Sequence, residues 1–214
     1  MDQSVLDAIA RWPNVPAVYG WLSLSARGAW RLHPLGDAQL GGDGTGIANT
    51  QILGFIGRNY ACEPDGRWFF QNGPQRVYVR LDAAPFVVHL RPDSNALVTQ
   101  NDITIKTVTH WFADDQGQLY AQTDLGPARI DDRDLLGLAE VLECETGQAM
   151  LDALEELEQQ DDASLERPEG LQFFDPSAKY AALRHPAPLR HILRSDIAKT
   201  LNFVSNPGPM RSDS

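Results

Sequence analysis

The middle of the chain, between residues 67 and 123, limits the fold more than any other part of the sequence. It contains short runs rich in β-branched and aromatic residues, separated by turn-forming clusters such as 72–74 and 114–117. Strands that follow each other through short turns pair antiparallel, whereas parallel strands need long crossovers. The pattern therefore predicts an α+β fold with a twisted antiparallel sheet, and excludes a doubly wound parallel sheet. The expected strands are residues 67–71, 75–81, 86–91, 97–99, 103–112 and 119–123.

Amphipathic segments at helical spacing flank these strands, and we expect them to pack as helices on one side of the sheet. The expected helices are an N-terminal segment ended by Pro13, residues 47–59, a segment capped by Asp131 or Asp132, and a segment that begins near Met150. A hairpin is expected over residues 18–32. Residues 20–30 and 110–120 both have the pattern of strand, tight turn and strand, followed later by a helix. This likeness indicates either two repeated halves or a chance similarity of two hairpins.

Changes in composition along the chain predict three parts. Residues 1–146 form the expected α+β core, and residues 147–165 form an acidic helix packed on it. Residues 166–214 are rich in proline and are expected to be a tail that is partly helical, over 189–203, and otherwise linker or disordered.

Charge narrows the range of partners. The chain has 18 Lys and Arg against 29 Asp and Glu, which gives a formal net charge of −11. Such a chain is repelled by phosphate backbones and by anionic lipid surfaces, so we expect neither a nucleic-acid partner nor a membrane partner. Cys62 and Cys144 are far apart and form no zinc or disulfide pattern, which is typical of reduced thiols in a cytoplasmic protein. The N-terminus has no signal-peptide pattern.

Linear motifs for catalysis are not found. The glycine-rich stretch 41–46 matches neither a Walker A loop nor a dinucleotide fingerprint, and there is no G-x-S-x-G elbow. The five histidines lack the spacing of a metal site. We therefore predict no catalytic residue, no metal ligand and no cofactor, and favour a binding protein over an enzyme.

One candidate binding site does emerge from strand alternation. If residues 82–85 form a hairpin corner, the polar sides of two neighbouring strands share a face. That face would carry Arg76, Tyr78, Arg80, His89 and Arg91. Arginine beside an aromatic ring suits planar anions such as carboxylates and phosphates. The alternative is the ordinary polar, solvent-facing side of an antiparallel sheet.

A second candidate is a charge block. Acidic residues without any Lys or Arg among them occupy residues 140–166, and basic residues dominate from Lys179 onward. Three interpretations are open: the acidic block is a solvated helix face, it binds the basic tail, or it binds a basic partner. The leading prediction is thus a binding or regulatory module that recognises a small anion or acidic peptide through the cationic strand face. The alternative is a protein–protein adaptor that uses the helices in 140–166 and the basic C-terminal segment.

The run GRWFFQNGPQRVYV at residues 66–79, together with residues 20–22 and 55–60, resembles uncharacterised bacterial proteins grouped only as a domain of unknown function. Residues 77–88 more weakly resemble the family DUF1285. The second resemblance implies an α+β fold of repeated motifs and a role in signalling or ligand binding. It covers residues 15–142 and brings no catalytic residue with it.

Overall fold

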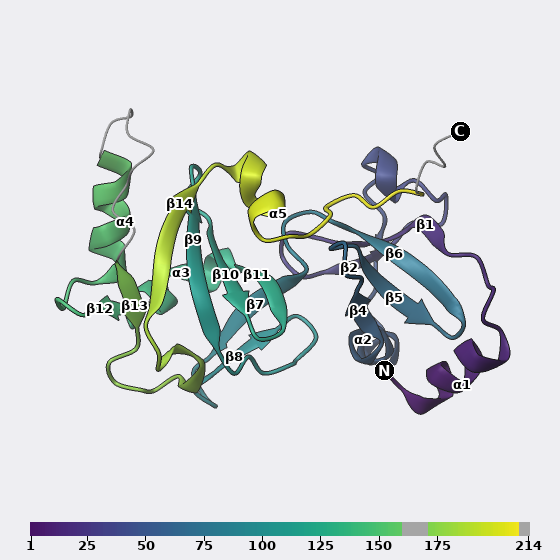
Figure 1. The fold of residues 1–214 in the computed structure, drawn as a ribbon, viewed down its shortest axis with the longest axis horizontal. Helices are drawn as coiled ribbons and strands as arrows, with labels where there is room; N and C mark the ends of the chain where they lie inside the picture. The colour runs from purple at the N-terminus through teal and green to yellow at the C-terminus, as the bar shows by residue number, and fades with distance from the viewer. Residues whose placement is uncertain (160–170, 210–214) are drawn as a thin grey trace. The chain divides into compact units, whose positions relative to one another are not determined.

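Two curled sheets, each mostly antiparallel, form the framework of the chain in the computed structural model (Figure 1). The structure describes residues 1–159 and 171–209. It divides into one unit of residues 1–85 with 202–214 and a second unit of residues 86–201. The predicted α+β class is confirmed. The chain returns to the first unit after residue 201, and the boundaries expected at 146 and 166 stay predictions.

The first unit holds a six-stranded sheet in the order β3-β2-β1-β6-β5-β4. Its elements are α1 (Gln3–Arg11), β1 (Val18–Leu24), β2 (Trp30–Leu32), η1 (Ala38–Leu40), β3 (Thr45–Gly46), α2 (Thr50–Arg58), β4 (Tyr60–Cys62), β5 (Trp68–Asn72) and β6 (Gln75–Leu81). β1 pairs parallel with β6, and Leu24 lies opposite Leu81. Leu24, Val79 and Leu81 are at most 3% exposed, so this central pair carries the core of the unit.

The second unit holds an eight-stranded sheet in the order β12-β13-β14-β9-β10-β11-β7-β8. Its elements are β7 (Phe86–Arg91), β8 (Ala96–Thr99), β9 (Val108–Asp114), β10 (Leu119–Thr123), β11 (Gly126–Ile130), α3 (Asp132–Ala139), β12 (Glu143–Cys144), α4 (Met150–Gln159), β13 (Gln172–Phe174), η2 (Ala181–Leu183), β14 (Ala187–Ile192), η3 (Arg194–Asp196) and α5 (Ile197–Thr200). β11 pairs parallel with β7, and β14 pairs parallel with β9. Trp111 on β9 is fully buried at the centre of this sheet.

Both units use the same strand order around their central parallel pair. In each, an antiparallel arm (β2-β1 or β8-β7) precedes a three-stranded meander (β4-β5-β6 or β9-β10-β11). The last strand of the meander then pairs parallel with the first strand of the arm. By this order, β1 corresponds to β7 and β9 corresponds to β4. The repeat expected from the sequence aligned residues 20–30 with 110–120, and so β1 with β9. The two alignments therefore match different strands.

The C-terminal segment is more ordered than expected. β13 and β14 extend the second sheet through backbone pairing, and Leu189 lies opposite Trp111. The expected helix over 189–203 is wrong in its first part, because alternating buried and exposed residues in β14 suit a strand. Residues 202–209 belong to the first unit, where the N–H of Val204 donates to the carbonyl of Gly66 at 2.9 Å. The part of the tail at 160–170 lies outside the described residues.

Across the described ranges, the helices are too short or too polar for any of them to span a bilayer.

The turn between β5 and β6 provides a test of backbone strain. Gly73 has φ +57°, and a Cβ at this position would have no heavy atom within 4 Å. We therefore expect Gly73→Val to lower the free energy of unfolding by about 1–3 kcal/mol through strain alone. Gly46→Val is the matched control, because Gly46 has equally open space and no positive φ. Urea denaturation of both variants measures the difference, and equal midpoints would contradict the strain argument.

Candidate functional site

The five residues of the predicted cationic face do not come from one hairpin. β6 carries Arg76, Tyr78 and Arg80 in the six-stranded sheet, whereas β7 carries His89 and Arg91 in the eight-stranded sheet. β6 pairs with β1 and β5, and β7 pairs with β8 and β11. The hairpin assumed at residues 82–85 is therefore wrong, because each strand finds a parallel partner far away in sequence.

Arg76 and Tyr78 converge on Glu63, which lies just after β4. The Arg76 guanidinium forms an ion pair with Glu63, and the Tyr78 hydroxyl donates to Glu63 Oε2 at 2.6 Å. Arg67 also pairs with this carboxylate at 2.6 Å and lies over the Tyr78 ring. Burial, together with the Glu63 carboxylate, raises the pKa of Tyr78 to about 12. Arg67 also pairs with Asp65 at 2.8 Å, so two arginines face two carboxylates and the cluster carries no net charge.

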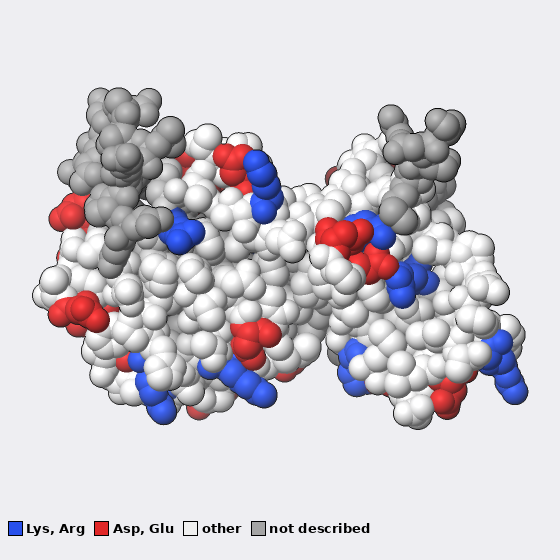
Figure 2. Space-filling view, viewed as in Figure 1, with Lys and Arg blue, Asp and Glu red and all other residues white. Residues whose placement is uncertain are grey.

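The other three residues of the predicted face also contact carboxylates. Arg80 pairs with Asp82 at 2.9 Å, Arg91 with Asp102 at 2.9 Å, and His89 with Asp134 at 3.1 Å. On the surface shown in Figure 2, basic and acidic side chains likewise occur in small mixed groups rather than in one basic stripe. Anion binding by these residues stays a prediction, but their contacts are those of ion pairs.

Arg80 and Arg91 allow a direct comparison of a buried and an exposed arginine. The Arg80 side chain is 13% exposed and also donates to the carbonyls of Ala38 and Gly42, at 2.6 and 3.1 Å. Arg80→Ala leaves partly buried acceptors without this donor, so we expect it to lower the free energy of unfolding by about 1–3 kcal/mol. Arg91→Ala breaks an ion pair whose side chains are 51% and 82% exposed. We expect it to lower the free energy of unfolding by less than about 1 kcal/mol. Denaturation of the ligand-free protein measures both, and equal effects would contradict this assignment.

A Ser–His–Asp arrangement lies between β1 and η1. Ser23 Oγ is 2.8 Å from His33 Nε2, and His33 Nδ1 is 3.3 Å from Asp37 Oδ1. These are the contacts of a catalytic triad. Ser23 and His33 are both 0% exposed, however, so no substrate reaches the hydroxyl in this structure. The three residues tie the β1–β2 arm to the following loop.

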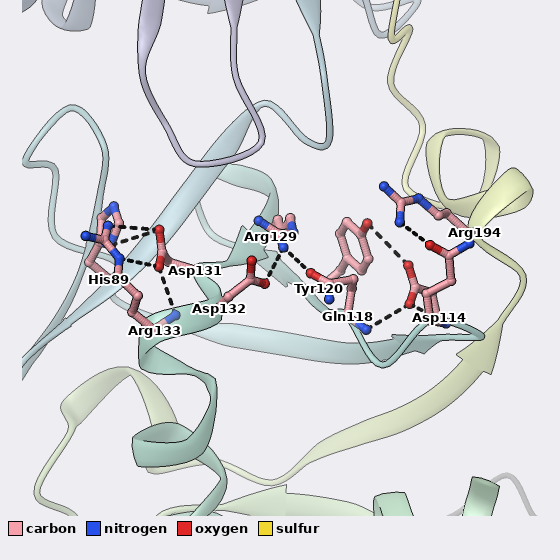
Figure 3. Close-up of polar contacts among 10 residues, drawn as sticks. His89, Asp114, Gln118, Tyr120, Arg129, Asp131, Asp132, Arg133 and Arg194 are labelled. Carbon is pink, nitrogen blue, oxygen red and sulfur yellow. Dashed lines mark hydrogen bonds and ion pairs between the residues drawn. The ribbon is translucent and has the colours of Figure 1, made fainter.

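The second unit contains a polar network along β9, β10 and β11 (Figure 3). Asp114, 3% exposed, accepts the backbone N–H groups of Gln116 and Gln118 on Oδ1, at 2.9 and 2.8 Å. Its Oδ2 lies 3.5 Å from the Tyr120 hydroxyl, which is long for a hydrogen bond. Burial, followed by the nearby Asp114 carboxylate, raises the pKa of Tyr120. Arg129 connects Gln118 of this network to the first residue of α3.

Arg129 is 6% exposed and donates to both Gln118 and Asp132. Asp132 is the first residue of α3, so the contact holds the start of the helix against the β9–β10 turn.

A pocket of about 200 Å³ lies beside this network. Its apolar lining comes from β9, β10, α3 and α4, and its polar lining comes from the end of β9, the β9–β10 turn, α4 and β14. The lining residues are Ala113, Asp114, Gly117, Gln118, Leu119, Leu135, Leu151, Leu154, Glu155 and His191. The pocket therefore combines an apolar wall with two carboxylates and the imidazole of His191. An apolar wall with a few polar groups is the usual composition of a site for an amphipathic small molecule.

A second polar group lies at the junction of β7, β11 and α3 (Figure 3). Asp131 caps α3 by accepting the N–H of Arg133 at 3.0 Å, and it also accepts the Arg133 guanidinium at 2.9 and 3.1 Å. These hydrogen bonds lower the pKa of Asp131 to about 2. His89, Asp131 and Asp134 hold their possible ligand atoms within 4.8 Å of one another, and are thus able to face a single metal ion.

The lowered pKa of Asp131 predicts acid sensitivity. A carboxyl that titrates near 3.8 when unfolded and near 2 when folded adds about 2 kcal/mol of stability above pH 4. That contribution is lost as the pH falls through the folded pKa. Arg133→Ala removes the largest cause of the shift, so we expect a smaller loss of stability between pH 5 and pH 2 than in the wild type.

Urea denaturation at several pH values measures this slope. Arg91→Ala is the control, because its partner Asp102 is largely exposed. An unchanged pH dependence in Arg133→Ala would contradict the assignment.

Sequence reasoning missed both the pocket and the His89 group. β11 was not predicted, and without it Asp131 has no strand to place it beside β7. The available signal was the pair Asp131 and Asp134, three residues apart at the start of a predicted helix. The part of the acidic block beyond residue 159 lies outside the described residues, while Asp152, Glu155 and Glu156 of α4 are exposed.

Comparison with known proteins supports the resemblance seen in the sequence. The family DUF2944, described as "Protein of unknown function (DUF2946)", matches residues 1–208. No curated protein matches the chain. Among solved structures, the chain is similar to a DUF1285 family protein from Silicibacter pomeroyi DSS-3, with 18% identity, a TM-score of 0.46, and 69% of this chain and 89% of that chain covered. It is also similar to a DUF1285 family protein from Shewanella baltica OS155, with 16% identity, a TM-score of 0.40, and coverage of 56% and 90%.

Proposed function

The chain belongs to the DUF2944 family of proteins of unknown function, and we propose that it is a regulatory module whose second unit binds a small organic amine. The observation that carries the proposal is the pocket in that unit, in which half-buried leucines face a buried carboxylate. Ligand binding in a cytoplasmic regulatory protein was expected from the sequence. The place of binding and the charge of the ligand are revised here.

The apolar lining limits the size of the ligand. Leu135 of α3 and Leu151 and Leu154 of α4 are only half-buried, although leucines of globular proteins are usually inside. A volume of about 200 Å³ is slightly larger than a cavity of about 150 Å³ that holds benzene. A single ring or short alkyl chain with one polar head fits this space.

The charged lining decides the sign of the head group. Asp114 and Glu155 contribute carboxylates, and none of the described lining residues is a lysine or an arginine. Asp114 Oδ2 has the Tyr120 hydroxyl 3.5 Å away, so it retains capacity to accept a stronger donor. An ammonium group supplies such a donor, and its hydrogen bond to a carboxylate is charge-assisted. This favours a cation over the anion expected from the sequence.

Three probes with the same ring and different heads test the proposal: benzylamine, benzyl alcohol and benzoate. In protein-observed NMR titrations we expect benzylamine to bind most tightly and to shift the amide signals of Gly117 and Gln118. Benzoate is expected to bind most weakly. Tighter binding of benzoate would reverse the sign of the head group and restore the anion prediction. No shift with any probe would remove the pocket as a site.

Two matched pairs of variants locate the binding. Glu155→Gln removes a charge from the pocket and should lower the affinity for benzylamine about two- to fivefold. Glu156→Gln lies outside the pocket and should leave that affinity unchanged. Leu135→Ser removes an apolar contact and should weaken binding about tenfold, whereas Leu136→Ser at a 59% exposed position should leave it unchanged. Equal effects within either pair would place the binding elsewhere.

The protein–protein adaptor is the second candidate. It is favoured by the exposed acidic side chains of α4, among them Asp152, Glu155 and Glu156. An adaptor of this kind binds a basic peptide with an affinity that falls as salt rises, because the charges are solvent-exposed. In that case Glu156→Gln lowers the affinity for the peptide as much as Glu155→Gln does. This result distinguishes an adaptor from amine binding in the pocket.

A further inference from the structure

We propose that His89, Asp131 and Asp134 bind a divalent transition-metal ion at the junction of β7, β11 and α3. This site is separate from the amine pocket, and its test does not depend on that function. The three side chains come from a strand, the residue after a strand, and a helix, so tertiary structure rather than a local motif brings them together.

The distances suit a single ion. His89 Nδ1 lies 3.1 Å from Asp134 Oδ2 and 3.9 Å from Asp131 Oδ2, and all three possible ligand atoms fall within 4.8 Å. Ligands bound about 2.1 Å from one ion are separated by about 3 to 4 Å, depending on the angle between them. Asp131 Oδ2 also accepts the Arg133 Nη2–H at 3.1 Å, so an ion at this site shares that oxygen with the guanidinium or displaces it.

Hydrogen bonds already orient the buried ligand. Asp131 Oδ1 accepts both the backbone N–H and the Nε–H of Arg133, at 3.0 and 2.9 Å. In metal sites, coordinating carboxylates are typically held by such outer contacts. Because Asp131 is only 1% exposed and accepts these hydrogen bonds, its carboxylate is held in one orientation.

Charge and access also suit a cation. The two carboxylates and one guanidinium have a net charge of −1, which attracts a cation. The side chains of His89 and Asp134 are 23% and 24% exposed, so an ion has a path from solvent and room for water ligands. In the metal-free form the Nδ1 of His89 donates a proton to Asp134, and coordination requires that this proton moves to Nε2 or to solvent.

The ligand types point to the class of metal. One imidazole and two carboxylates match borderline ions such as Zn²⁺, whereas an all-oxygen set would favour Mg²⁺ or Ca²⁺. We therefore use Zn²⁺ as the probe and Mg²⁺ as the comparison ion. The exposed thiol of Cys62 is a competing zinc ligand and must be tested as well.

Calorimetric titration of the chelator-treated full chain with Zn²⁺ tests the site. We expect one ion per chain, much weaker binding of Mg²⁺, and a loss of at least about tenfold in Zn²⁺ affinity in His89→Ala and in Asp134→Asn. Cys62→Ser and the exposed His185→Ala are the controls, and both should bind as the wild type does. Asp131 is left intact because it caps α3.

A second measurement covers the case in which a variant fails to fold. Nitrogen NMR of the wild-type histidine rings should show a large shift of His89 Nδ1 on addition of Zn²⁺, with the ring of His185 unchanged. Wild-type affinity in folded His89→Ala, loss of binding in Cys62→Ser, or an unshifted His89 ring would each overturn the proposal.

Discussion

The parallel pairing of β11 with β7 is the constraint on which the second unit depends. It places Ile130 opposite Val88, and the N–H of Asp131 donates to the Val88 carbonyl at 3.0 Å. The chain leaves β11 at this point and enters α3 directly, so the cap of the helix is held beside His89. The same pairing fixes Arg129 on β11, whose contact with Asp132 and Gln118 connects α3 to the turn that lines the pocket. Disturbing one backbone register would therefore displace both candidate sites.

Ion pairing explains why several arginines of this acidic chain are partly buried against carboxylates. Arg76, Arg80 and Arg129 have side chains that are at least half buried, and each contacts a carboxylate. A guanidinium removed from water is costly unless its donors are satisfied, so a buried arginine selects acidic or carbonyl neighbours. The excess of acidic residues then lies on the outside, as with Glu155 and Glu156 of α4. A strand face that reads as cationic in the sequence is thus neutralised in the fold.

Local structure was predictable from the sequence and long-range pairing was not. The turn at Gly73 and the helix ended by Pro13 follow from the chemistry of a few adjacent residues, and both lie where expected. Which strands become neighbours depends on contacts between distant segments, and alternation along β6 and β7 carries no information about their partners. The sites were missed for the same reason, since His89 and Asp131 meet only after β11 pairs with β7. The α+β class was recoverable because short turns alone favour antiparallel pairing.

Access, more than the identity of the side chains, separates the clusters in this chain. Ser23, His33 and Asp37 have the contacts of a hydrolytic triad, yet the serine and histidine are fully buried. A nucleophile must reach a carbonyl carbon, and a hydroxyl without exposure cannot do so, whatever its hydrogen bonds. His89 and Asp134 keep about a quarter of their side-chain surface open to solvent. A metal ion is small enough to enter through that opening, and the polar atoms around it are already oriented. The same kind of hydrogen-bonded histidine therefore stabilises an arm of the sheet in the first unit and forms an accessible binding group in the second.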